Sequence, residues 1–228
     1  AGAGAVHYHD LMAGKKSKLG DLWALNCMSA MFEPQILMDL SEHGMFIAQL
    51  YGSTETTGGG LINFAHDAKH IGAIGKPDGH CEIKLDNGEI CMRGGDVMLG
   101  YYKDPKGTAE VIDAEGWFHT GDLAREDEDG YYFLTGRKKN VIILDSGENV
   151  SPEELEGLLE KCPAVKECLV KEKGKKICAV VCCEEADQQT VRDFITETNR
   201  TLPLYKRISA VEFSAQPLPR NAMGKLMR

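Results

Sequence analysis

The 228-residue sequence predicts a mixed α/β and α+β protein with two parts. The first part is expected to combine the edge of an α/β layer with a small β-barrel-like subdomain, and the second to be a small α+β domain. Three observations predict this: a strand–helix–strand pattern over 19–60, short β runs separated by turn residues over 71–136, and alternating strands and helices over 141–228. The expected boundaries are therefore 1–136 and 141–228, with 137–140 between them.

The α/β piece is predicted from three consecutive segments. An apolar run covers 19–27, and an amphipathic helix is expected over 33–44, since apolar residues recur there at helical spacing and Gly44 follows as a stop signal. Residues 45–51 predict a buried strand. The loop 51–60 then leaves the carboxyl end of that strand, which is where ligands bind in open α/β sheets.

The β subdomain is predicted by two hairpin signals. Asn87-Gly88 and Asp129-Gly130 lie between apolar runs. Both pairs tolerate the positive φ angles of tight hairpin turns, so they indicate antiparallel strands on either side.

The second part alternates strands with helices. Strands are expected at 141–144, 165–171, 176–183 and 208–213, and helices at 151–161 and 187–199. The first helix has a strong start signal, because Ser151 suits the N-cap, Pro152 suits the first turn, and Glu154 can complete a capping box.

Composition and charge exclude several functions. The net charge of −9 argues against nucleic-acid binding, which needs a surplus of Lys and Arg, and no apolar run is long enough to cross a membrane. No secretory signal is evident, so a cytoplasmic protein with reduced cysteines is expected. No C-x-x-C pair occurs, which argues against a metal–thiolate site. The first Met is at position 12, which suggests a fragment.

The loop that begins Tyr51-Gly52-Ser53-Thr54-Glu55 carries groups suited to a nucleotide. Glycine lets the backbone approach a ligand, Thr54 offers a hydroxyl, Glu55 offers a hard oxygen ligand for Mg²⁺, and Tyr51 offers an aromatic face for a purine. An ordinary glycine-rich loop is the alternative interpretation. A Walker phosphate loop is excluded, because G-x-x-x-x-G-K-[ST] is absent.

Further polar groups follow along the chain. Asp122 lies in a Gly-Asp turn just after His119, where a structural role is the simpler interpretation, although a carboxylate there could hold ribose hydroxyls with Arg137 as a nearby donor. Asn140 tolerates the unusual backbone angles that a hinge needs. Lys225, near the chain end, would ordinarily be solvated, but two nearby prolines could direct it toward a site.

These segments together resemble the carboxyl-terminal half of the adenylate-forming (AMP-forming) acyl-CoA ligase superfamily. The family's motifs look matched, in order, by 51–55, by G-E-x-x-x-R-G at 88–94, by G-Y-Y at 100–102, and by 136–140 and 219–225. The segment that begins Gly-Arg-Lys-Lys-Asn is most similar to bacterial long-chain fatty-acyl-CoA ligases. The family's Ser/Thr/Gly-rich phosphate loop, which ends in Pro-Lys-Gly, is not matched.

The resemblance implies a nucleotide site in a partial large amino-terminal domain. Tyr51 and the adjacent Gly52 would lie beside adenine, Thr54 would contact phosphate, and Asp122 with Arg137 would hold the ribose.

The resemblance also implies roles in catalysis and movement. Glu55 would bind Mg²⁺, and Lys225 would drive adenylation. Asn140 matches the hinge position, where the family more often has Asp or Lys. Gly147 matches the loop that faces the pantetheine channel during thioester formation, so the second part would be a small mobile lid.

The implied reaction has two steps and uses ATP, Mg²⁺ and coenzyme A. A carboxylic acid, expected to be a fatty acid, forms acyl-AMP and is then transferred to the thiol. Two alternatives stay open: an adenylation domain that loads a carrier-protein thiol, and a non-catalytic interaction or regulatory remnant of the fold. These residues alone are expected to be inactive.

Overall fold

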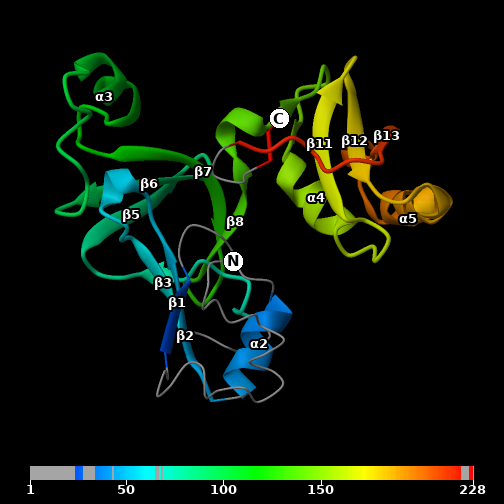
Figure 1. Ribbon diagram of the computed structural model, residues 1–228. Coiled ribbons are helices and arrows are strands. Elements are labelled where there is room, and N and C mark those ends of the chain that lie inside the picture. Colours follow the sequence, from blue (N-terminus) through cyan, green and yellow to red (C-terminus); the bar gives the residue numbers. More distant parts are fainter. Residues whose placement is uncertain are drawn as a thin grey trace. The chain divides into compact units, whose positions relative to one another are not determined.

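A computed structural model shows the protein as two compact units, residues 1–134 and 135–228, and each is described by itself (Figure 1). The structure describes residues 24–27, 34–42, 44–64, 67, 69–221 and 226–227. The predicted mixed α/β class is confirmed. Among the described residues, no helix is long and apolar enough to cross a membrane.

Most elements lie close to their predicted positions. The strands are β1 (Ala24–Cys27), β2 (Phe46–Tyr51), β3 (Leu61–Asn63), β4 (Lys76–Pro77), β5 (Cys81–Asp86), β6 (Glu89–Gly94), β7 (Phe118–Glu126), β8 (Tyr132–Arg137), β9 (Ile142–Ile143), β10 (Asn149–Val150), β11 (Glu167–Lys173), β12 (Lys176–Cys182) and β13 (Ala210–Ser214). The helices are α2 (Pro34–Glu42), α3 (Pro105–Val111), α4 (Pro152–Leu159) and α5 (Gln188–Thr201). Of these elements, β3, β4, β10 and α3 were not predicted.

The first sheet of the first unit has the order β1-β2-β3-β4. β1 is parallel to β2, and α2 lies between them in the chain and beside β2 in space (Figure 1). Leu37 and Leu40 of α2 pack against Ile47 of β2 in a small buried cluster. This arrangement places Tyr51 at the carboxyl end of a parallel strand.

The second sheet of the first unit has the order β5-β6-β7-β8. The barrel-like form of this subdomain stays a prediction. β5 and β6 form the predicted hairpin, with Asn87 at φ 49° and Gly88 at φ 83° in its turn. Ile90 and Met92 of β6 are fully buried, in one cluster with Leu61 of the first sheet. The two sheets therefore share a core.

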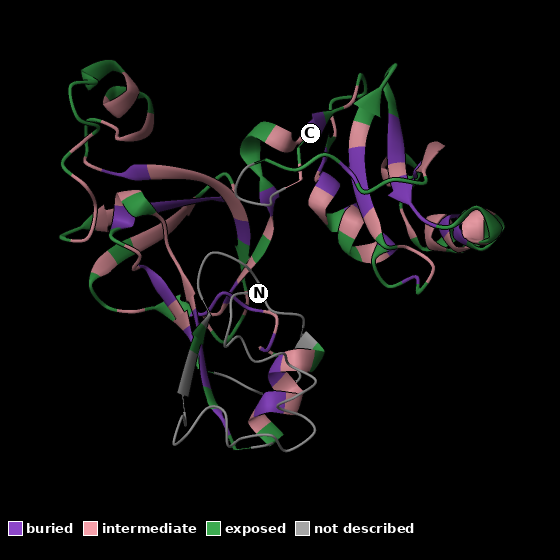
Figure 2. Ribbon diagram, viewed as in Figure 1, coloured by how far each residue is buried: buried purple, intermediate pink, exposed green. Residues whose placement is uncertain are grey.

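The second unit is built on a three-stranded sheet of order β11-β12-β13. β11 and β12 are antiparallel and β13 is parallel to β12, while α4 and α5 contribute apolar residues to the core over this sheet (Figure 2). Leu155 of α4 and Val191 of α5 are both fully buried there. The cysteines described in this unit are buried free thiols: Cys162, Cys168, Cys178, Cys182 and Cys183.

The predicted capping box at the start of α4 is wrong. Ser151 does occupy the N-cap position, but its side chain makes no capping hydrogen bond. Its hydroxyl instead lies 2.5 Å from the carbonyl oxygen of Thr135, to which it donates, and Glu154 binds Lys206 Nζ at 2.7 Å. The hydroxyl therefore donates to a distant carbonyl and does not accept from the local backbone N–H.

One prediction concerns a polar cluster on the first unit. His70 stacks on Tyr131 with ring centroids 4.1 Å apart, and its ring nitrogens each lie 3.0 Å from a carboxylate, of Asp67 and of Asp129. The Asp67 hydrogen bond, with a smaller one from Asp129, raises the pKa of His70 despite its partial burial. A group whose pKa rises on folding stabilises the fold at pH values below its unfolded pKa of about 6.5, and this stabilisation is lost as the pH rises through the folded pKa.

His70→Gln should therefore lower the free energy of unfolding more at about pH 5.5 than at about pH 8.5. Urea unfolding at both pH values would measure this difference. His80→Gln, which changes an exposed histidine, is the control. An equal loss at the two pH values would contradict the prediction.

Candidate functional site

The loop after β2 is held in one conformation by its own hydrogen bonds. Thr54–Thr56 form a single 3₁₀ turn. The Ser53 N–H donates to Thr56 Oγ1 at 2.9 Å, and the Gly58 N–H donates to the Ser53 carbonyl at 2.8 Å. The turn that carries the candidate phosphate and magnesium ligands is thus preformed at the end of a parallel strand.

Gly52 is required by the way this loop closes. A Cβ atom there would lie 2.5 Å from the carbonyl oxygen of Gly59 and 2.7 Å from that of Gly58. Beside it, the Ser53 hydroxyl oxygen is buried and has no hydrogen-bond partner in the described part of the chain. A buried polar atom of this kind can be satisfied by a bound water or ligand.

Two predicted nucleotide-binding residues meet at the end of β2. The Tyr51 hydroxyl donates to Asp122 Oδ2 at 2.8 Å, although 71 positions separate the two residues. Asp122 is held on β7 by its own N–H, which donates to Thr120 Oγ1, and the Thr120 hydroxyl donates in turn to the Ile90 carbonyl of β6. An aromatic ring and an oriented carboxylate are therefore side by side.

Glu55 has a partner that the sequence did not indicate. The Tyr101 hydroxyl, from the Gly-Tyr-Tyr segment, donates to Glu55 Oε1 at 2.9 Å, and the Met98 N–H donates to the Glu55 carbonyl at 2.7 Å. The neighbouring carboxylate raises the pKa of Tyr101. A carboxylate has about four lone-pair sites, so Glu55 can accept from Tyr101 and ligate a hard cation together.

The tripeptide Pro105-Lys106-Gly107 does occur in the chain, but it starts a helix. Asp104 is the N-cap of α3, and its side chain accepts from the Gly107 N–H at 2.8 Å. A Cβ at Gly107 would lie 2.4 Å from Asp104 Oδ2. These residues therefore form a helix start, and they do not supply the missing phosphate loop.

Three predicted site residues belong to the second unit. Arg137 ends β8 and is exposed. The Asn140 side-chain amide donates to Glu153 Oε1 at 2.6 Å. Gly147 lies in a turn at φ 91°, where a Cβ would meet nothing within 4 Å. Lys225 lies outside the described residues.

A partly buried polar cluster supports the strand that carries Asp122. Glu89 is 4% exposed, and its Oε1 accepts from the Gly121 N–H at 3.0 Å. His119 lies between two carboxylates, with Nδ1 3.2 Å from Glu89 Oε2 and Nε2 3.4 Å from Asp113 Oδ2. The sequence alone does not indicate the partners of His119, because they come from other strands and loops.

Comparison with known proteins gives matches to both parts of the chain. The AMP-binding enzyme family model matches residues 5–102, and the model of the AMP-binding enzyme carboxyl-terminal domain matches residues 139–228. Long-chain-fatty-acid–CoA ligase FadD15 of Mycobacterium bovis is 41% identical over 56% of this chain and 21% of its own length. Feruloyl-CoA synthase of an Amycolatopsis species is 32% identical over 94% of this chain and 46% of its own length.

A solved structure matches the fold across nearly the whole chain. O-succinylbenzoate coenzyme A synthetase (MenE) of Bacillus subtilis, in complex with ATP and magnesium ion, has a TM-score of 0.78 and 25% identity, over 97% of this chain and 53% of that chain. This chain therefore spans about half the length of these relatives or less.

Proposed function

Since this chain belongs to the adenylate-forming acyl-CoA ligase superfamily, we propose that it is part of an enzyme that activates a carboxylic acid with ATP and then forms an acyl-CoA thioester. The carboxylate oxygen would attack the α-phosphorus of ATP, and the bond to pyrophosphate would break. The thiol of coenzyme A would then attack the acyl carbon, release AMP and lose its proton to solvent. A carboxylate is a poor electrophile until it gains such a leaving group.

The observation that carries this proposal is the hydrogen bond between Tyr51 and Asp122. It joins an aromatic face, suited to adenine, to an oriented carboxylate, suited to vicinal ribose hydroxyls. The unpartnered Ser53 hydroxyl beside Gly52 adds a polar atom that a nucleotide can satisfy. In this proposal Tyr51 and Gly52 flank the base and Asp122 holds the ribose; the family resemblance assigns Arg137 to the ribose as well.

The residues present also fit Mg²⁺. Mg²⁺ binds proteins through one or two carboxylates plus substrate phosphates, and Glu55 is a partly exposed carboxylate on the preformed turn. We propose that Glu55 holds the ion and that Thr54 contacts phosphate. The ion would neutralise charge on the phosphates, while Tyr101 keeps the Glu55 side chain oriented.

The second unit is proposed to act as a lid. Asn140 would be the hinge, and Gly147, whose turn leaves open space beside its α-carbon, would border the channel for the pantetheine arm. Lys225 would serve adenylation and the Gly147 turn would serve thioester formation, so one site would carry out both steps in sequence.

The acid is proposed to be a fatty acid. The relative with 41% identity is a fatty-acid ligase, whereas relatives matched over more of the chain act on feruloyl or o-succinylbenzoyl groups by name. The proposed enzyme that contains this chain is here called the longer ligase. Its release of pyrophosphate with a fatty acid, compared with its release with an aryl acid, would test this. We propose that the 228 residues alone release none, because the phosphate loop is not among them.

Tyr51→Phe should weaken binding of an acyl-AMP analogue by roughly 2- to 13-fold, the loss of one hydrogen bond. The ring would still cover the base, but Asp122 would lose the donor that orients it. Calorimetric titration of the ligase that contains this chain would measure the change. Tyr102→Phe is a matched control, because Tyr102 is 88% exposed. Equal affinities for Tyr51→Phe and the control would contradict the proposed site.

A further inference from the structure

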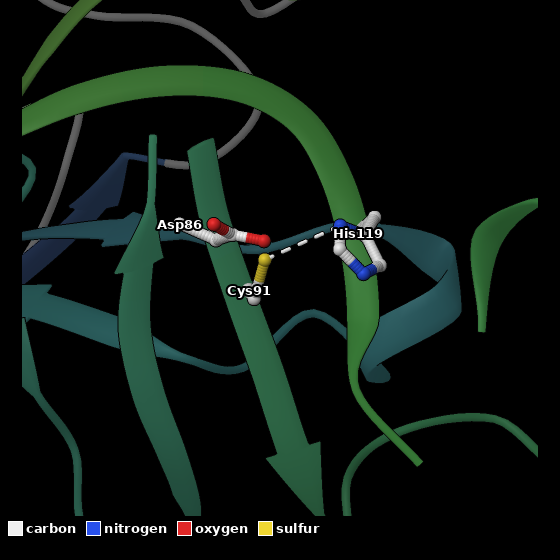
Figure 3. Close-up of side chains that lie close together, drawn as sticks. All are labelled: Asp86, Cys91 and His119. Atoms are coloured by element: carbon white, nitrogen blue, oxygen red, sulfur yellow. Dashed lines mark hydrogen bonds between the residues drawn. The ribbon is translucent and has the colours of Figure 1, made fainter. Parts of the chain in front are cut away.

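A thiol, an imidazole and a carboxylate lie close together on the second sheet of the first unit, β5-β6-β7-β8 (Figure 3). Cys91 of β6 and His119 of β7 are directly opposite in register, and Cys91 Sγ lies 3.4 Å from His119 Nδ1. Asp86, at the end of β5, brings a carboxylate oxygen within 4.8 Å of the Cys91 sulfur and of a ring nitrogen of His119. The spacing along the sequence did not indicate this group, because three different strands supply it.

The groups around His119 favour binding of a metal cation next to its ring. Its two ring nitrogens face two carboxylates, Glu89 at Nδ1 and Asp113 at Nε2. A neutral imidazole has a single N–H and can donate to only one of them. If Nε2–H donates to Asp113, the lone pair of Nδ1 faces the Glu89 carboxylate and the Cys91 sulfur. That nitrogen, the sulfur and the nearby Asp86 carboxylate then lie close enough to bind one metal ion.

We propose that Cys91, His119 and Asp86, together with Glu89, form a structural site for Zn²⁺ or a similar divalent transition metal. A tetrahedral zinc, with bonds of about 2.3 Å to sulfur and about 2.1 Å to nitrogen, holds those two atoms about 3.6 Å apart. The observed separation is 3.4 Å. Binding would release the Cys91 thiol proton to solvent, and mixed sulfur and nitrogen ligands select such metals over Mg²⁺ or Ca²⁺.

Asp113 fits the arrangement that supports metal-binding histidines. Such a histidine usually donates its second ring N–H to a carboxylate, which fixes the tautomer and the ring orientation. Asp113 Oδ2 is 3.4 Å from Nε2, and its other oxygen accepts from the backbone N–H groups of Glu115 and Trp117, so the carboxylate is itself held in place.

This metal would also stabilise the proposed ribose-binding strand. Glu89 would contribute Oε2 to the metal while Oε1 keeps its hydrogen bond from the Gly121 N–H, next to Asp122. Metal binding can be tested without the proposed ligase reaction, because no proposed nucleotide-binding residue is a ligand.

A second group of ligand-like side chains, His70, Asp127 and Asp129, carries no comparable argument. It contains no sulfur, and Lys69 already binds Asp129 at 2.5 Å. It therefore serves as an internal reference, since it cannot give a sulfur-to-metal signal.

The test uses Co²⁺ as the probe, added to the reduced, metal-free 228-residue chain. We expect a near-ultraviolet sulfur-to-cobalt charge-transfer band, visible bands typical of tetrahedral cobalt, and displacement of both by Zn²⁺. Cys91→Ser should abolish the charge-transfer band. Cys81→Ser, which changes a partly buried free cysteine on the neighbouring strand, should leave it unchanged.

Two further variants keep the test decisive if Cys91→Ser does not fold. Asp86 is exposed, so Asp86→Asn should fold normally and still weaken cobalt binding at least tenfold. Asp113→Asn should weaken it by about 10- to 100-fold while the band keeps its position. No charge-transfer band in the folded parent chain, or one retained in folded Cys91→Ser, would overturn the proposal.

Discussion

Lys225→Ala in the longer ligase should slow acyl-adenylate formation by about 10²- to 10³-fold, the usual cost of removing one preorganised charge from a developing transition state. In the proposed reaction, negative charge gathers between the attacking carboxylate and the α-phosphate. A lysine is a compact point charge that can neutralise both. Thioester formation from preformed acyl-AMP should change little, because that step does not create the same charge.

Measuring the two half-reactions separately distinguishes a role of Lys225 in adenylation from a role in both steps. Pyrophosphate release measures adenylation, and AMP release from supplied acyl-AMP and coenzyme A measures thioester formation. Lys176→Ala, which removes an exposed lysine of the same unit, should affect neither. A similar loss in both half-reactions would show that Lys225 supports the fold or both steps, and would contradict the proposed role.

Gly75→Ala should destabilise the first unit by roughly 3 kcal/mol or more, through backbone strain and overpacking together. Gly75 has φ 112°, and a Cβ atom there would lie 2.1 Å from the carbonyl carbon and oxygen of Ile62. Its own carbonyl accepts from the Tyr132 N–H at 2.9 Å, which ties the start of β4 to β8. The nearest atoms are all backbone, so a methyl group cannot be accommodated by a side-chain rotation.

The expected loss corresponds to a decrease of roughly 6–12 °C in the unfolding midpoint of a chain of this size. Gly72→Ala is the matched control: it lies three residues away, and a Cβ there would meet nothing within 4 Å. Thermal unfolding followed by circular dichroism would compare the two variants. If their midpoints agree, the close approach of the backbone at Gly75 does not contribute as proposed.

Features set by local chemistry could be predicted from the sequence. The order of strands and helices follows from residue periodicity, and the Asn87-Gly88 turn follows from the tolerance of both residues for positive φ. The parallel pairing of β1 with β2 follows from the helix between them.

Contacts between distant segments could not be predicted in the same way. The hydrogen bonds from Tyr101 to Glu55 and from Tyr51 to Asp122 span 46 and 71 positions, and no periodicity indicates them. The register that places Cys91 opposite His119 depends on a bulge between β6 and β7. The capping box at Ser151 is wrong for a related reason, since the Ser151 hydroxyl donates to a carbonyl that lies 16 positions away in the chain.

The reaction of the buried cysteines with a thiol reagent can report how often the second unit opens. Burial raises the pKa of the Cys178 and Cys183 thiols, so little thiolate is present at neutral pH to react with an alkylating reagent. Every cysteine described in this unit lies in its interior. The rate at which a thiol reagent modifies them is therefore governed by how often the unit opens. A ligand that stabilises the closed fold would slow this modification without contacting any of the thiols.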